Sequence, residues 1–237
     1  MPEDNINNIR KIFYHEIGHL CVDIMKIDIV NDAYLNNLNI SYISNANQNE
    51  SLNWCGYVEV LPEYPYSNIP KDLHVFSSFL LSLVSGCIFQ TTLNNIYLQK
   101  NDDFRDCFGR GNNCLGVKDF HDYNRIVSEF LKINEDSRGN RKLLQFMYGD
   151  IIDIFYKELI SKKSFINELI LITEDYIKAI DEAFRKHDSS NTFSYDIKNE
   201  QLSQLINDIK IVLDKHGIFK FINSKIEFIV KTIEEKR

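Results

Sequence analysis

The chain is poor in glycine and proline, with 9 Gly and 4 Pro among its 237 residues. Flexible and low-complexity stretches are usually rich in these residues, so the composition excludes them over most of the chain. Hydrophobic residues make up 44% and charged residues 26% of the sequence, as in ordinary globular proteins. We therefore expect most of the chain to fold around a substantial core.

The sequence also lacks a run of basic residues. It has 34 acidic against 27 basic residues, which gives a formal net charge of -7. Surfaces that bind nucleic acid or anionic membranes depend on clustered Lys and Arg to neutralise phosphate groups. Neither kind of partner is therefore expected.

Long hydrophobic runs are missing as well. We find no window of about 18 uncharged apolar residues, the length needed for a membrane-spanning helix. The first residues, MPEDNINNIRK, lack the charged and then apolar layout of a signal peptide. These absences predict no membrane span and a cytoplasmic location.

Cysteines are few, and their number is odd. They are Cys21, Cys55, Cys87, Cys107 and Cys114. Most have apolar neighbours, so we expect reduced, half-buried thiols and no disulfide framework. The six-residue spacing between Cys107 and Cys114 does not match a CxxC metal site.

Periodic patterns predict a mainly α protein of α+β type. Apolar residues at steps of three and four predict an amphipathic helix over residues 5–28. Two β-type runs, 38–44 and 54–62, predict a small antiparallel hairpin beside that helix. A loop is expected over 101–116, and the other predicted helices cover 71–99, 117–133, 140–161, 164–187, 197–215 and 217–235.

This pattern predicts two parts of the chain, a domain that carries the candidate site and a helical extension. Residues 1–136 contain every candidate site residue and are expected to form one domain. Residues 137–237 carry stripes of Ile, Leu and Phe that indicate a helical extension packed on that domain.

The string HEIGH at residues 15–19 is the strongest chemical signal in the chain. On a helix, residues four apart share one face, so His15 and His19 can both ligate one tetrahedral Zn²⁺. Glu16 is displaced around the helix and can reach a water molecule rather than the metal. Gly18 is costly in mid-helix, which indicates that a strand or a substrate backbone approaches closely there.

Catalytic zinc sites usually have a third protein ligand and an open position. The candidates from the residues alone are His74, Asp119, His121 and Asp122, all in or near predicted helices. Spacing does not choose among them. His187 and His216 lie in the tail and are expected to be exposed.

Four landmarks in order resemble the protease domain of the FtsH-type ATP-dependent zinc metalloproteases. The chain has the active-helix string HEIGH, then WCGYVEVLP at 54–62, SGCIFQ at 85–90 and GVKDFHDY at 116–123. The similarity covers about residues 5–135. It implies a zincin-like helical domain in which His15, His19 and Asp119 hold Zn²⁺ and Glu16 is the catalytic carboxylate.

The resemblance implies a zinc metalloendopeptidase that acts on peptides or unfolded proteins. No GxxxxGK[ST] phosphate loop is present, so no ATPase motor is expected. The gap from Gly116 to Asp119 is one residue shorter than in the family, which keeps Asp122 open as the third ligand. Gln90 stands where the family has Glu, which changes the charge around the metal ligands.

Other interpretations stay open. A zincin of another HExGH family would use a downstream carboxylate such as Glu59, Glu63 or Glu129. A non-catalytic protein could keep the zinc for structure or bind a partner through its helical tail. A homo-oligomer or a protein partner stays open as well. The motif could also be accidental in a helical scaffold. Trp54 and Tyr57 are expected to pack or to line the edge where an extended peptide would bind.

Overall fold

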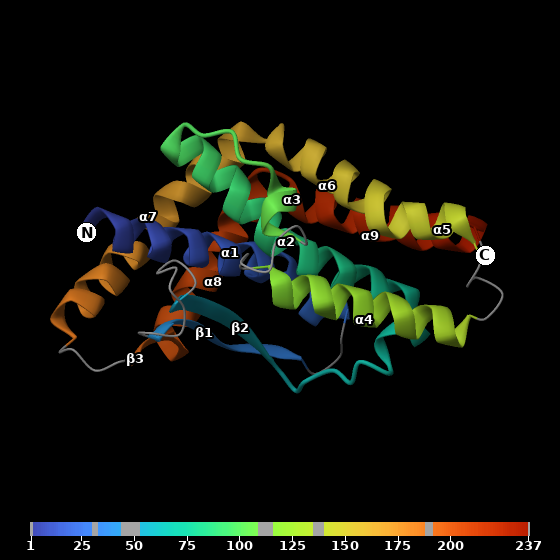
Figure 1. The fold of residues 1–237 in the computed structure, drawn as a ribbon, viewed down its shortest axis with the longest axis horizontal. Helices are drawn as coiled ribbons and strands as arrows, with labels where there is room; N and C mark the ends of the chain where they lie inside the picture. The colour runs from blue at the N-terminus through green and yellow to red at the C-terminus, as the bar shows by residue number, and fades with distance from the viewer. Residues whose placement is uncertain are drawn as a thin grey trace.

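The computed structural model describes residues 2–29, 33–43, 53–108, 116–134, 140–187 and 192–236 (Figure 1). The described part is mainly helical with one small sheet, as predicted. Its longer helices are α1 (Pro2–Ile29), α2 (Leu73–Leu98), α4 (Val117–Ile133), α6 (Ile151–Ile160), α7 (Lys163–Lys186), α8 (Asn199–Lys215) and α9 (Ile218–Lys236). The short helices are α3 (Phe104–Cys107) and α5 (Arg141–Gln145), and the strands are β1 (Tyr34–Ile43), β2 (Trp54–Leu61) and β3 (Thr192–Ile197).

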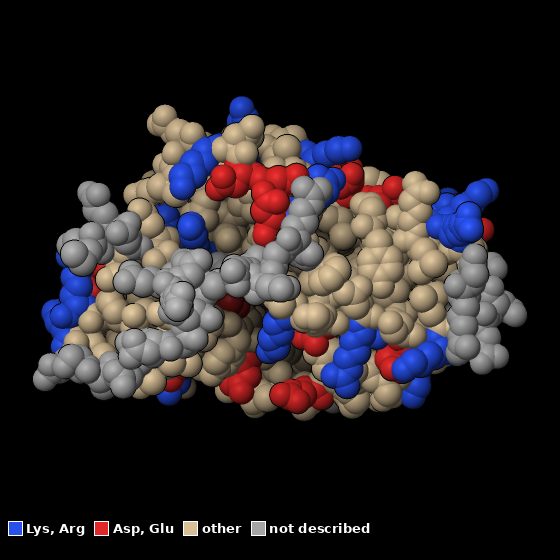
Figure 2. Space-filling view, in the orientation of Figure 1, with Lys and Arg blue, Asp and Glu red and all other residues tan. Residues whose placement is uncertain are grey.

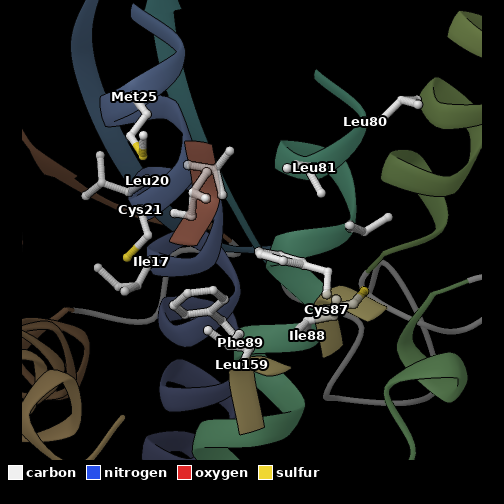
Figure 3. Close-up of a cluster of buried hydrophobic side chains, with 14 of the residues drawn as sticks. Ile17, Leu20, Cys21, Met25, Leu80, Leu81, Cys87, Ile88, Phe89 and Leu159 are labelled. Atoms are coloured by element: carbon white, nitrogen blue, oxygen red, sulfur yellow. The ribbon is translucent and has the colours of Figure 1, made fainter. Parts of the chain in front are cut away.

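Helix α1 forms the centre of the molecule. It packs on α2, on the sheet and on α7 and α8, so almost every residue from 9 to 26 is buried. Figure 3 shows part of this core, with Ile17, Leu20 and Met25 on α1 and Ile88 and Phe89 on α2. The amphipathic pattern predicted a helix with one wet face. The structure instead covers that polar face with other elements, which turns HEIGH inward.

The sheet has three antiparallel strands in the order β2-β1-β3. The hairpin of β1 and β2 was predicted, whereas β3 was not. Its segment, TFSYDI, alternates polar and apolar residues over only six positions, which is a weak signal beside the long helical patterns on both sides. Because β3 lies on the far side of β1, β2 is an edge strand.

Helix α2 lies within the predicted helix 71–99, but it contains an apolar window that the sequence analysis did not find, with a mean hydropathy of 1.6. It is the one helix in the described ranges whose length and composition would suit a membrane span. In the structure, 72% of its most apolar window is buried, under α1, α3, α4, α6, α7 and α9. That environment is the one expected of a central core helix.

The expectation of reduced cysteines is wrong for one pair. Cys87 on α2 and Cys107 at the end of α3 form a disulfide, with Cα atoms 5.5 Å apart. No local pattern predicts this disulfide, because the 20-residue separation is closed only when α3 folds back on α2. Cys21 is free and buried, Cys55 is free and exposed, and Cys114 lies outside the described residues.

Candidate metal centre

The three polar residues of HEIGH lie in the interior of the protein. His15 is 5%, Glu16 4% and His19 9% exposed. Ionisable side chains are seldom buried without a charge partner or a metal. Their burial excludes the simplest alternative, in which two histidines and a glutamate line the wet side of a surface helix.

Asp119 completes a compact triangle with the two histidines. Its Oδ2 lies 2.8 Å from His15 Nε2 and 3.3 Å from His19 Nε2, and the two Nε2 atoms are 3.1 Å apart. Ligand atoms held at about 2.0 to 2.1 Å from a tetrahedral zinc ion are about 3.3 Å apart. The three atoms therefore need only a small expansion to hold one ion.

Hydrogen bonds on the far side of each ring orient these atoms. His19 Nδ1 donates to the backbone carbonyl of Ser82 at 2.8 Å, and His15 Nδ1 donates to Gln90 Oε1 at 3.2 Å. In the neutral form that an ion would require, with the proton on Nδ1, each ring would direct its Nε2 lone pair into the triangle. Gln90 thus supplies the acceptor that orients His15, a role that its weak sequence landmark did not reveal.

Asp119 reaches the centre from the first turn of α4, whose N-terminal residue is Val117. The partial positive charge at a helix N-terminus favours the ionised carboxylate. Asp122, one turn later, lines the same cleft but is not part of the triangle. The structure therefore brings together the three residues that the resemblance implied.

The other candidate residues have other partners. Glu59 accepts a hydrogen bond from Asn36, Glu129 pairs with Lys132, and His74 faces Asp72 and Glu227. Glu63 and His121 are exposed. Of the tail histidines, His187 is exposed as predicted, whereas His216 is half-buried against Glu168 at 2.7 Å. Among the described residues, the groups that could share an ion are His15, His19 and Asp119, and His15, Cys87 and Cys107.

Gly18 and Gly86 allow α1 and α2 to pack closely at the centre. A Cβ at Gly86 of α2 would lie 2.5 Å from His19 Nε2 and 2.8 Å from His15 Nε2. A Cβ at Gly18 would lie 2.5 Å from the Ser85 carbonyl oxygen. The predicted close approach at Gly18 is therefore real, but the approaching element is helix α2 and not a strand or a substrate.

The charges of the centre suit a cation. Burial alone would lower the pKa of His19, but the nearby charge and hydrogen bond of Asp119 raise it to about 9. Burial would raise the pKa of Asp119, yet His19 and hydrogen bonds from both histidines lower it well below its usual range. Two oriented nitrogens and an ionised carboxylate form a donor set that fits a divalent ion such as Zn²⁺.

Glu16 is set apart from the triangle. Burial raises the pKa of its carboxyl group, although the neighbouring histidines partly oppose that shift. A Cβ at Gly56 of β2 would lie 2.9 Å from Glu16 Oε1, so the strand leaves space for this carboxylate. A carboxyl group with a raised pKa beside a cation site is suited to take and return a proton.

The centre opens into a cleft of about 310 Å³ between α1, α2, α4 and β2. The cleft continues into a second hollow of about 670 Å³ that follows β2 and the segment after it. The two hollows share seven lining residues: Asp23, Lys26, Tyr57, Val58, Tyr66, Phe79 and Lys118. Both residues behave as expected: Tyr57 lines this groove, and Trp54 packs in the interior against Tyr42, Phe184 and Phe193.

On the face shown in Figure 2, Lys and Arg alternate with Asp and Glu, and the coloured residues form no broad basic area.

Comparison with known proteins gives no further guide to function, because no family model, curated protein or solved structure matches the chain.

Proposed function

We propose that the chain is a zinc-dependent peptidase that cleaves peptides or unfolded protein segments. The observation that carries this proposal is the triangle of His15 Nε2, His19 Nε2 and Asp119 Oδ2 with the buried carboxylate of Glu16 beside it. All three ligand atoms come from the positions that the family resemblance implies.

The three ligands and Glu16 have different roles in the proposed reaction. His15, His19 and Asp119 would hold Zn²⁺, which when bound supplies an acidified water and polarises the scissile carbonyl. Glu16 accepts a proton from the attacking water and passes it to the departing amine. Burial raises the pKa of Glu16, so its carboxylate is a stronger base than that of an exposed glutamate, which favours its acceptance of the proton.

The groove along β2 supports an extended polypeptide as the substrate. Within the described ranges β2 pairs only with β1, so its other edge could accept an added strand. Gly56, opposite Glu16, is on this strand, so a chain paired with β2 would pass the catalytic carboxylate. No phosphate-loop motif for an ATP-driven motor occurs in the given sequence, and we propose substrates that are already unfolded.

The test combines metal analysis with a hydrolysis assay. Purified protein is expected to carry one zinc per chain and to cleave an unfolded substrate such as casein. Glu16→Gln should keep the zinc and reduce cleavage by about 10² to 10⁴-fold, because it removes the proton acceptor but no ligand. His19→Ala and Asp119→Ala should lose the metal.

Glu129→Gln is the matched control, since Glu129 pairs with Lys132 on the outside of α4. It should change neither zinc content nor cleavage. Stoichiometric zinc without cleavage that depends on Glu16, across varied unfolded substrates, would disprove the peptidase and leave a zinc-binding protein. Absence of zinc would remove the metal centre itself.

A further inference from the structure

A second set of possible metal-ligand atoms lies next to the proposed centre and shares His15 with it. Cys87 is the residue after Gly86 on α2, and its partner Cys107 ends α3 (Figure 3 shows Cys87 beside Ile88). Both cysteines are buried. Their sulfur atoms and a ring nitrogen of His15 lie within 4.8 Å of one another.

Gln90 links this sulfur pair to His15. Its Oε1 accepts the hydrogen bond from His15 Nδ1 at 3.2 Å and also lies 3.5 Å from Cys107 Sγ. The cluster therefore contains two sulfurs, one imidazole and one amide oxygen, the four donors that a tetrahedral site requires. Thiolates and imidazole together select soft or borderline ions such as Zn²⁺.

We propose that the Cys87 and Cys107 pair is a redox-controlled metal site that competes with the His15, His19 and Asp119 centre. In the disulfide the sulfurs are bonded to each other and cannot act as thiolate ligands. A thiol reductant such as glutathione supplies two electrons and two protons, and the disulfide becomes two thiols while two glutathione molecules become their own disulfide. The two thiols then lose their protons when they bind the ion.

His15 makes the two sites mutually exclusive. In the centre it keeps the proton on Nδ1 and offers Nε2. An ion held by the thiolates would take Nδ1, so the neutral ring would carry its proton on Nε2, which can then no longer serve the centre. Reduction should therefore move the ion away from Glu16. This regulatory consequence rests on the proposed peptidase function, whereas the thiolate site does not.

Cobalt(II) reports the site directly, because thiolate ligation gives an intense near-ultraviolet charge-transfer band and histidine or carboxylate ligation does not. The full chain is used with Cys114→Ser in every sample, so that this cysteine cannot contribute. We expect the oxidised protein to bind cobalt without the band, and the anaerobically reduced protein to show it.

Variants assign the band. Cys87→Ser and Cys107→Ser should each reduce it by at least half, and Cys55→Ser, at an exposed free cysteine, should leave it unchanged. Asp119→Asn removes the proposed catalytic centre only, so its reduced form should keep the band. If one cysteine variant fails to fold by circular dichroism, the other decides.

The outcomes separate the two proposals. A reduced chain without the band, or a band that both cysteine variants retain, overturns the thiolate site, whatever the peptidase assay shows. A band that depends on Cys87 and Cys107 in a protein without peptidase activity supports the site and leaves its regulatory role without a target.

Discussion

At the scale of single residues, the candidate centre depends on which ring nitrogens are occupied. Ser82 and Gln90 each accept a hydrogen bond from a Nδ1 atom, so both Nε2 atoms face Asp119. These acceptors come from α2, not from the helix that carries HEIGH. The motif therefore supplies the ligands, and the neighbouring helix orients them.

A substitution at Gly86 tests whether the packing of α2 orients the ligands on α1. Alanine at this position would place a methyl group 2.5 Å from His19 Nε2, so the rings must move apart or the helices must separate. We expect Gly86→Ala to weaken zinc binding by about 10 to 100-fold, as for other changes that disturb ligand orientation. Titration against a chromophoric chelator measures this. Gly149→Ala, where a Cβ would meet nothing within 4 Å, should bind zinc normally, and an equal loss in both variants would contradict the argument.

The raised pKa of His19 predicts how zinc binding varies with pH. Since the pKa is about 9, zinc must displace a proton from His19 below that pH. The proton on His19 should make the apparent affinity rise about tenfold per pH unit as the pH approaches 9 and level off above about 9. Asp119→Asn removes the main stabilising charge, so its weaker binding should level off at a lower pH.

The same shift affects the stability of the metal-free protein. Protonated His19 is favoured in the folded state, so its contribution is fully present below the unfolded pKa of 6.5. It is lost as pH rises through about 9. Thermal unfolding of chelator-treated protein should therefore show falling stability over this range, and His19→Gln should flatten that part of the curve.

At the scale of elements, β3 is held to β1 by side-chain hydrogen bonds from two buried asparagines as well as by the pairing of the two strands. Asp196 of β3 accepts hydrogen bonds from Asn37 at 2.9 Å and from Asn39 at 2.7 Å. Both asparagines are buried on β1. This contact fixes the register of a strand that periodicity alone did not predict.

Asp196→Ala should therefore destabilise the fold by about 1 to 3 kcal/mol, because it removes an acceptor shared by two buried donors. Chemical denaturation measures the loss. The hydrogen bonds from Asn37 and Asn39 lower the pKa of Asp196, so their contribution is present above about pH 3.8 and disappears as pH falls through the lowered value. Lys198→Ala, which removes only the exposed partner of Asp196, should cost less than about 0.5 kcal/mol.

At the scale of the whole molecule, the predicted extension, residues 137–237, packs extensively on the predicted domain, residues 1–136. Glu174 of α7 accepts hydrogen bonds from Arg10 at 3.1 Å and from Tyr14 at 3.3 Å, both on α1. Helices α6, α7 and α9 cover α2, and β3 completes the sheet. Residues 137–237 therefore help to bury the two helices that form the candidate centre.

This coupling predicts that residues 1–136 do not fold alone. The apolar surface of α1 and α2 would be exposed without α6 to α9, so the fragment should be insoluble or lack cooperative unfolding. Co-expression with residues 137–237 as a separate chain should restore solubility and zinc binding. Solubility, circular dichroism and zinc content check this, and a soluble, cooperatively folded 1–136 fragment would contradict it.

The sequence by itself determined the long helices, the β1 and β2 hairpin and the placing of His15, Glu16 and His19 on one helix, because helical periodicity and the HEIGH spacing are local properties of the chain. It did not show helix α3, which lies in the predicted loop 101–116, or the division of the predicted helix 140–161 into shorter segments. Asp119 was chosen through the family resemblance, and its distance from the histidines became visible only in the fold. The third strand, the disulfide, the burial of the polar face of α1 and the roles of Ser82 and Gln90 were decided by the tertiary structure. Each depends on groups far apart in the sequence that packing brings within a few ångströms, and no local pattern encodes such contacts.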